Sequence, residues 1–137
     1  MKKKKVLLID DDKAFVLFAK SSLESTGAFD VTVAAGGPQG IALAQREKPD
    51  VILLDRLMPQ MSGKVVAESL SEGPGTKQIP VIFLTSMISK EQVKSESIIT
   101  IDSQDFIAKD IGVQGLINCL TDFFKEKGSC GKINLLT

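Results

Sequence analysis

Side chains that can hold a cation or stabilise a charged oxygen each follow an apolar run of this chain. They are Asp10, Asp11 and Asp12 after the first run, Asp55 after residues 51–54, and Thr85 and Lys109 after two later runs. If the runs are strands of one parallel sheet, their carboxyl ends lie at the same edge, where open α/β sheets bind ligands. The spacing therefore predicts one site in which carboxylates, a hydroxyl and an ammonium meet.

This set of groups favours phosphoryl chemistry around a metal ion. Carboxylates packed close together repel one another, and a hard divalent cation such as Mg²⁺, which prefers oxygen ligands, relieves the repulsion. Asp55 would then be the nucleophile, with Thr85 and Lys109 stabilising the charge on the transferred oxygens. A simpler interpretation competes for each residue: Asp12 caps the following helix, and a lone Thr or Lys at a strand end has no special role.

Five short apolar runs alternate with helical patterns along the chain. The predicted strands are residues 6–9, 31–34, 51–55, 80–84 and 106–108, and the predicted helices are residues 14–23, 41–45, 64–70, 89–97 and 113–124. Gly36, Gly37 and Pro38 indicate a turn before the second helix. Runs that are apolar on both alternating faces are typical of strands covered on both sides. The pattern predicts an α/β fold, a doubly wound five-stranded parallel sheet with right-handed crossovers and helices on both faces.

The size and composition fit one globular domain. The chain has 137 residues, of which 43% are hydrophobic and 25% charged, and we expect a domain over residues 1–128 with a tail or linker start at residues 129–137. The charges balance at 17 basic and 17 acidic residues, so non-specific nucleic-acid binding is not expected. No apolar run is long enough for a membrane span or a signal peptide, which predicts a cytoplasmic protein without membrane contact.

The chain contains no histidine. Ser-His and Cys-His nucleophile pairs and histidine metal ligands are therefore excluded, and any phosphohistidine must come from another protein. Cys119 and Cys130 lack metal-ligand spacing; in a cytosolic chain we expect free thiols, with a disulfide as the less favoured alternative.

Four sequence elements together resemble the response-regulator receiver domains of two-component signalling. Asp10 and Asp11 are similar to the acidic pair of that family, and residues 55–63, DRLMPQMSG, match its D-x-x-M-P-x-M-x-G phosphorylation loop. Thr85 and Lys109 stand where the family has its hydroxyl residue and its lysine. The resemblance covers roughly residues 4–127, with the elements in the family's order.

The resemblance implies a flavodoxin-like fold with strand order 2-1-3-4-5. It implies that Asp55 accepts a phosphoryl group from a sensor histidine kinase or a histidine phosphotransfer protein. Mg²⁺ would be held by the side chains of Asp11 and Asp55 and the Leu57 carbonyl, with Asp10 acting through water. Phosphorylation would draw Thr85 inward and change a surface that binds a downstream protein; a homodimer through the last helix is possible.

Phe106 occupies the position of the family's rotating aromatic residue, although a plain core position is the alternative. Lys109 is followed by Asp110 instead of the usual proline, so we expect a trans peptide and a different loop before the last helix. Residues 98–101 read as extended, β-branched chain, which predicts a short or displaced fourth helix. Leu57 and Met87 flank the site with apolar side chains that cannot orient water, which predicts a long-lived phosphate on Asp55.

Three functions remain open at this point. The first is a phosphoacceptor switch, catalytic only in its own phosphorylation and dephosphorylation. The second is a receiver-like protein-binding module that works without phosphorylation, which the altered corner at Lys109 and Asp110 would permit. The third is an aspartyl-phosphate phosphohydrolase, which is disfavoured because Leu57 replaces the second aspartate that such enzymes carry two residues after the nucleophile.

Overall fold

The computed structural model of this chain describes residues 2–86, 98–101, 104–125 and 132–134. They form two compact units, Met1–Val81 and Ile82–Thr137. In the first unit the elements are β1 (Lys4–Ile9), α1 (Lys13–Ser25), β2 (Phe29–Ala34), α2 (Gly37–Glu47), β3 (Val51–Asp55) and α3 (Gly63–Glu72).

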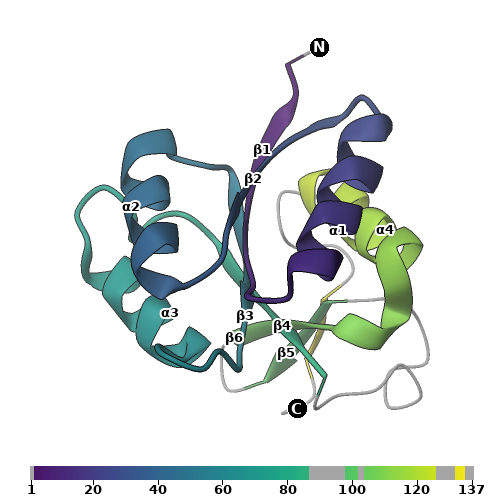
Figure 1. Ribbon diagram of the computed structural model, residues 1–137. Coiled ribbons are helices and arrows are strands. Elements are labelled where there is room, and N and C mark those ends of the chain that lie inside the picture. Colours follow the sequence, from purple (N-terminus) through teal and green to yellow (C-terminus); the bar gives the residue numbers. More distant parts are fainter. Residues whose placement is uncertain (1, 87–97, 102–103, 126–131, 135–137) are drawn as a thin grey trace. The chain divides into compact units, whose positions relative to one another are not determined.

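The three strands of the first unit are parallel, in the order β2-β1-β3. Helix α1 covers one face of this sheet, and α2 and α3 cover the other (Figure 1). Parallel strands sandwiched in this way need apolar side chains on both faces. The predicted arrangement of helices on both faces of a parallel sheet is therefore present in this unit.

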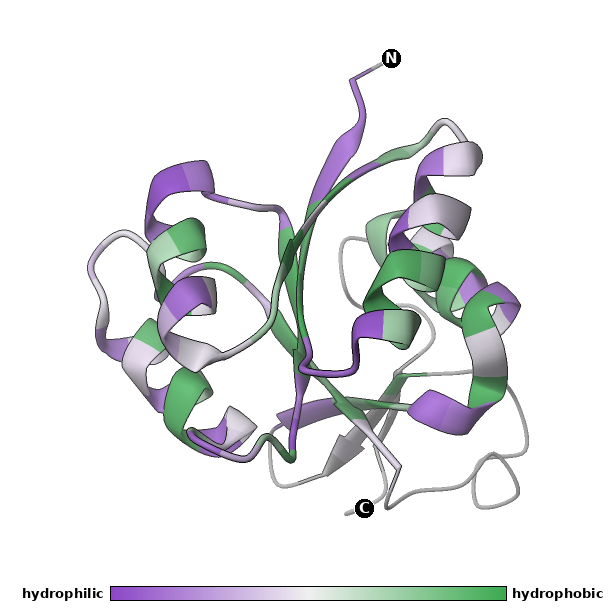
Figure 2. Cartoon of the chain, in the orientation of Figure 1, coloured by the Kyte–Doolittle hydropathy of each residue, from purple (hydrophilic) through white to green (hydrophobic). Residues whose placement is uncertain are grey.

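Strands β1 and β3 form the core of the first unit. Residues 6–9 of β1 are at most 1% exposed, and residues 51–54 of β3 are 0% exposed. Figure 2 shows these strands as hydrophobic segments that end in hydrophilic residues. Because burying a large aliphatic side chain contributes about 1.5–3 kcal/mol, this pair of strands is a stable base for the residues at their carboxyl ends.

Helix α1 begins and ends as the sequence indicates. The Asp12 side chain accepts a hydrogen bond from the Phe15 N–H over 3.1 Å, which confirms the capping interpretation of Asp12. After the helix, Gly27 adopts a φ of 82°, a left-handed conformation that glycine reaches at little cost.

Helix α2 starts earlier than predicted. Gly36 is its N-cap, Gly37 is its first residue, and Pro38 lies in the first turn. The predicted turn through these residues is wrong, because proline is well tolerated in a first helical turn, where an N–H has no partner within the helix. A Cβ on Gly40 would lie 2.5 Å from Ile9 Cδ1, so glycine lets α2 pack closely on β1.

The second unit continues the alternation with an added hairpin. Its elements are β4 (Val81–Thr85), which begins at the unit boundary, β5 (Ile98–Ile101), β6 (Gln104–Ala108), the 3-10 helix η1 (Lys109–Ile111), α4 (Gly112–Lys125) and β7 (Lys132–Asn134). β4 and β6 are parallel, β5 is antiparallel to β6, and β7 is parallel to β5. The predicted extended chain at residues 98–101 is confirmed as β5, whereas the predicted helix at residues 89–97 lies outside the described residues.

The corner after β6 also matches expectation. No cis peptide bond occurs in the described part of the chain, and Lys109 and Asp110 form one turn of 3-10 helix instead of a proline loop. Gly112, with a φ of 81°, then leads into α4. In the predicted tail, residues 132–134 form β7; the division at residue 128 stays a prediction.

No helix in the described ranges is long and apolar enough to cross a membrane.

Candidate functional site

Three carboxylates meet at the carboxyl ends of β1 and β3. Asp10, Asp11 and Asp55 each offer an oxygen, and these oxygens lie within 4.8 Å of one another. The parallel register places Ile9 beside Leu54, so the next residues of the two strands, Asp10 and Asp55, are neighbours. Asp10 is 1% and Asp55 7% exposed, whereas Asp11 is exposed.

Main-chain amides orient the two buried carboxylates. The Asp12 N–H donates to Asp10 Oδ1 over 3.0 Å, and the Leu57 N–H donates to Asp55 Oδ1 over 3.3 Å. In each case a carboxylate accepts from the residue two positions later, which is the geometry of an Asx turn. The same backbone turns that end the strands therefore aim the carboxylates.

Gly63 closes the loop that follows Asp55. Its N–H donates to the Arg56 carbonyl over 3.0 Å, and a Cβ on Gly63 would press on the Asp55 carbonyl oxygen and lie 2.9 Å from Arg56 Cα. Backbone atoms cannot give way as a flexible side chain can. In the sequence, Gly63 was recognised only as the last residue of the D-x-x-M-P-x-M-x-G motif, and that place was the available signal for this role.

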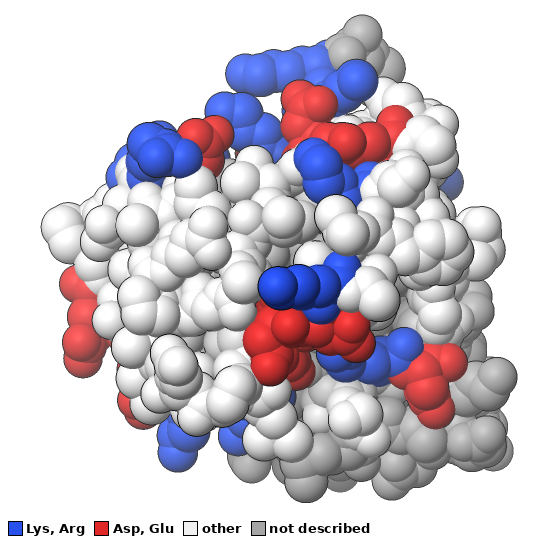
Figure 3. Space-filling model, viewed as in Figure 1, with Lys and Arg blue, Asp and Glu red and all other residues white. Residues whose placement is uncertain are grey.

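The acidic cluster fits a hard divalent cation. All three side chains supply oxygen donors at close range, which is the donor set that Mg²⁺ prefers, and three nearby negative charges favour a cation. Figure 3 shows acidic side chains gathered where β1 ends and α1 begins. The backbone of Leu57 lies beside Asp55 through their hydrogen bond; coordination by the Leu57 carbonyl stays a prediction.

Cavities flank the cluster on two sides. One of about 220 Å³ is lined by Asp11, Met58 and Met61, together with the loop before α2. Another of about 280 Å³ is lined by Asp10 and Leu17. Asp11 and Asp10 therefore each line a cavity at the edge of the cluster.

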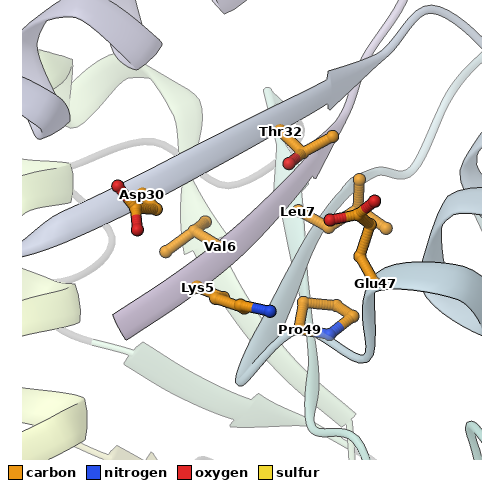
Figure 4. Close-up of a pocket in the computed structure, with 7 residues that line it drawn as sticks. All are labelled: Lys5, Val6, Leu7, Asp30, Thr32, Glu47 and Pro49. Atoms are coloured by element: carbon orange, nitrogen blue, oxygen red, sulfur yellow. The ribbon is translucent and has the colours of Figure 1, made fainter. Parts of the chain in front are cut away.

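A third cavity, of about 160 Å³, lies away from this site, toward the start of β1 (Figure 4). Side chains of both charge signs line it, among them Lys5, Asp30 and Glu47. Asp10 directly follows the opposite end of β1, so this cavity takes no part in the acidic site.

Thr85 and Lys109 belong to the second unit. Thr85 is 3% exposed and pairs in register with Ala108, the residue before Lys109. These two predicted site residues therefore end neighbouring parallel strands. Their convergence on Asp55 stays a prediction.

Phe106 is a core residue in this structure. It is 8% exposed and stacks on Phe83, with ring centroids 5.3 Å apart and an interplanar angle of 27°. The two residues are also opposite one another in the β4–β6 register. This geometry agrees with the plain core interpretation and also with the inward position of a rotating aromatic residue.

Comparison with known proteins identifies the family. The model of the response regulator receiver domain matches residues 6–121. This chain belongs to that family. The receiver is 37% identical over 83 residues to the response regulator PleD of Caulobacter vibrioides, covering 61% of this chain and 18% of PleD. It is 31% identical over 125 residues to the probable transcriptional regulatory protein TcrX of Mycobacterium tuberculosis, covering 90% of this chain and 50% of TcrX.

The receiver also resembles solved structures. The chemotaxis protein CheY4 of Vibrio cholerae superposes with a TM-score of 0.72 at 26% identity, covering 88% of this chain and 98% of that one. The predicted fold class is confirmed: the receiver has a flavodoxin-like fold with a five-stranded parallel sheet of order 2-1-3-4-5, flanked by helices, in which β6 is the fifth parallel strand and β5 and β7 are additional strands. The aligned regions span 18% and 50% of the lengths of PleD and TcrX.

Proposed function

We propose that this receiver is a phosphoacceptor switch of a two-component system or phosphorelay, with Asp55 as the acceptor. A carboxylate oxygen of Asp55 attacks the phosphorus of a partner's phosphohistidine. The P–O bond to Asp55 forms as the P–N bond breaks, and the departing imidazole of the partner takes up a proton. The receiver is a signalling module and acts catalytically only on its own phosphorylation state.

Asp11 and Asp55 would hold Mg²⁺ directly, with the Leu57 carbonyl, and Asp10 would act through water. When bound, the metal neutralises charge on the carboxylates and on the phosphoryl oxygens. The main-chain N–H groups of Asp12 and Leu57 keep the Asp10 and Asp55 carboxylates oriented while the phosphoryl group adds negative charge to the site.

Thr85 and Lys109 are the proposed stabilisers of the phosphoryl group. A hydroxyl and an ammonium are the donors that such oxygens need. Thr85 and Phe106 would change position on phosphorylation and alter the surface offered to a downstream protein. In this proposal, the change starts from the inward position in which Phe106 stacks on Phe83.

An apolar surface on α1 suits the protein that brings the phosphoryl group. Leu17 and Phe18 are 64% and 65% exposed, and Leu17 shares a cavity lining with Asp10. Large exposed apolar side chains next to a reactive site mark a protein contact. We propose that a sensor histidine kinase or a histidine phosphotransfer protein docks here.

The proximity of Asp10, Asp11 and Asp55 carries the proposal, and a small phosphodonor tests it. Incubation with acetyl phosphate and Mg²⁺ should add one phosphoryl group, detected by intact-protein mass spectrometry. Asp55→Asn should abolish the gain. Asp12→Asn is the matched control, because Asp12 caps α1 and asparagine caps equally well; this variant should gain the phosphoryl group as the parent does.

The second candidate is a binding module that works without phosphorylation. The 3-10 turn at Lys109 and Asp110, where the family usually has a proline, favours it. The same incubation decides between the two: no mass gain in the parent chain would favour the binding module, whereas an equal gain in Asp55→Asn would show that Asp55 is not the acceptor.

A further inference from the structure

Strand β5 extends the sheet beyond β6, which corresponds to the fifth strand of the family. One of its edges pairs antiparallel with β6, with Ile99 opposite Phe106 and Thr100 opposite Asp105. Thr100 Oγ1 also donates to Asp105 Oδ1 over 2.7 Å. Because β6 holds one edge of β5, the outer edge of β5 is the place where a further strand can add.

The occupant of that outer edge is a strand from the end of the chain. β7 pairs with β5 in parallel, with Ile98 opposite Lys132, Ile99 opposite Ile133 and Thr100 opposite Asn134. Only three residue pairs hold it. A parallel ladder this short supplies few hydrogen bonds, and parallel pairing is slightly weaker per residue than antiparallel pairing. β7 is therefore poorly anchored compared with the strands of the core.

The chain between α4 and β7 has a limited reach. α4 ends at Lys125 and β7 begins at Lys132, so residues 126–131 span at most about 20 Å when extended. If β7 comes from another molecule, the α4 of that molecule must therefore end within about 20 Å of β5. The β7 of a second copy has the same sequence, so it can pair with β5 in the same register, whereas an unrelated segment cannot.

We propose that the outer edge of β5 is a strand-docking surface and that two copies of this chain dimerise by exchanging β7. Exchange conserves every β5–β7 hydrogen bond, so the dimer and the closed monomer differ mainly in the connecting segment and in concentration. The contact lies one strand from Phe106, because Ile99 is opposite both Phe106 and Ile133. The proposal does not depend on phosphorylation of Asp55.

Cysteines placed across the ladder test the exchange. Thr100→Cys and Asn134→Cys are opposite in register, and the spacing of paired strands, about 4.8 Å, is within the Cα separation of disulfides. The full chain carries both changes with Cys130→Ser; Cys119 is 2% exposed. Isotope-labelled and unlabelled copies are mixed, oxidised at micromolar and at near-millimolar concentration, and analysed on non-reducing gels and by peptide mapping.

Exchange predicts a covalent dimer with a 100–134 link between a labelled and an unlabelled copy, whose share rises with protein concentration by mass action. Adding Ile133→Pro should remove the link while Thr137→Pro, beyond the paired residues, should keep it; thermal melts verify that both variants fold. An intramolecular 100–134 link at every concentration overturns the proposal. So does a dimer that Ile133→Pro leaves intact, or the absence of any 100–134 link.

Discussion

The Glu24 carboxylate of α1 accepts a hydrogen bond from the main-chain N–H of Val31 in β2 over 3.1 Å. Lys20, one helical turn earlier, donates to the Val31 carbonyl over 2.6 Å and to Glu24 over 3.0 Å. The N–H groups of Lys4 and Asp10 donate to the carbonyls of Ala28 and Ala34. Because the main-chain groups of successive residues in a parallel strand point alternately to its two sides, both groups of Val31 point away from β1. One ion pair therefore covers the outward groups of an edge-strand residue.

This arrangement gives the receiver an acid-sensitive contact. The hydrogen bond from Val31 and the ammonium of Lys20 hold the pKa of Glu24 below its ordinary value. Glu24 therefore stabilises the fold fully at pH values well above the unfolded-state pKa of about 4.3, and this stabilisation is lost as the pH falls through the lower pKa of the folded state. Because its side chain is 37% exposed, solvent screening limits the contribution to about 0.5–1 kcal/mol.

We expect Glu24→Gln to lower the free energy of unfolding by about 0.5–1 kcal/mol at pH 7. The difference from the parent chain should shrink as the pH falls below the unfolded-state pKa of about 4.3, because the contribution of Glu24 is lost as the pH approaches the lower pKa of the folded state. Urea unfolding at pH 3.5, 5 and 7 measures this. Glu68→Gln, at an exposed position of α3, is the control; a loss of stability that is the same at all three pH values would contradict the assignment.

Gly63→Ala should disturb the acceptor loop, because the new methyl group meets the backbone of Asp55 and Arg56. We expect the free energy of unfolding to fall by about 1–3 kcal/mol, as at other overpacked sites. Phosphorylation by acetyl phosphate should also be slower. Gly36→Ala is the comparison, since a Cβ at position 36 meets nothing within 4 Å. This variant should lower the free energy of unfolding by less than about 1 kcal/mol. Equal effects of the two changes would show that the close contact at Gly63 does not matter.

The positions of the strand ends were predictable because the apolar runs stop abruptly. The run of residues 51–54 is buried on both faces and leaves room for a charge only at Asp55, and the acidic pair follows β1 for the same reason. The start of α2 was missed because Gly37 and Pro38 also occur in turns. Local sequence does not separate a turn from a first helical turn when proline suits both.

Pairing partners were harder to predict than elements. The β-branched residues 98–101 indicated a strand, but no periodicity shows that this strand pairs antiparallel with β6. β7 has three residues, which is too short for any hydrophobic pattern. Lys20 and Glu24 have the spacing of a helical ion pair, yet their contact with Val31 depends on how α1 packs on β2. Such long-range contacts need the folded chain.

Mg²⁺ should stabilise the receiver through the acidic cluster. At ten times its dissociation constant a ligand adds about 1.4 kcal/mol, which is roughly 3–5 °C in Tm for a domain of this size. Asp11→Asn should raise the Tm without metal, because it relieves repulsion from Asp10 and Asp55. It should also weaken the response to Mg²⁺.

Thermal melts over a Mg²⁺ series at constant ionic strength make this measurement, with Asp12→Asn as the variant that keeps the full response. If Asp11→Asn and the parent chain gain the same Tm, Asp11 is not a ligand. If neither responds, the cluster does not hold the metal under these conditions, and the acetyl phosphate experiment should fail as well.

Leu57 should slow the loss of the phosphoryl group from Asp55. Leu57 lies two residues after the acceptor and is 60% exposed. Because its side chain is apolar, it offers an incoming water no hydrogen-bonding group. Met87, the second apolar residue predicted to flank the site, lies outside the described residues. We expect Leu57→Asn, which supplies an amide that can orient water, to shorten the lifetime of the acyl phosphate by roughly tenfold at neutral pH.

Mass spectra taken after rapid removal of acetyl phosphate, in Mg²⁺ buffer, follow this decay. Val65→Asn is the matched control, because Val65 is an exposed apolar residue of α3, 47% exposed, and its change should leave the lifetime as in the parent. A parent phosphate lost within seconds contradicts the shielding role. A lifetime that Leu57→Asn leaves unchanged would instead assign the control of water to other residues around Asp55, because the side chain at position 57 would then neither exclude nor orient the attacking water.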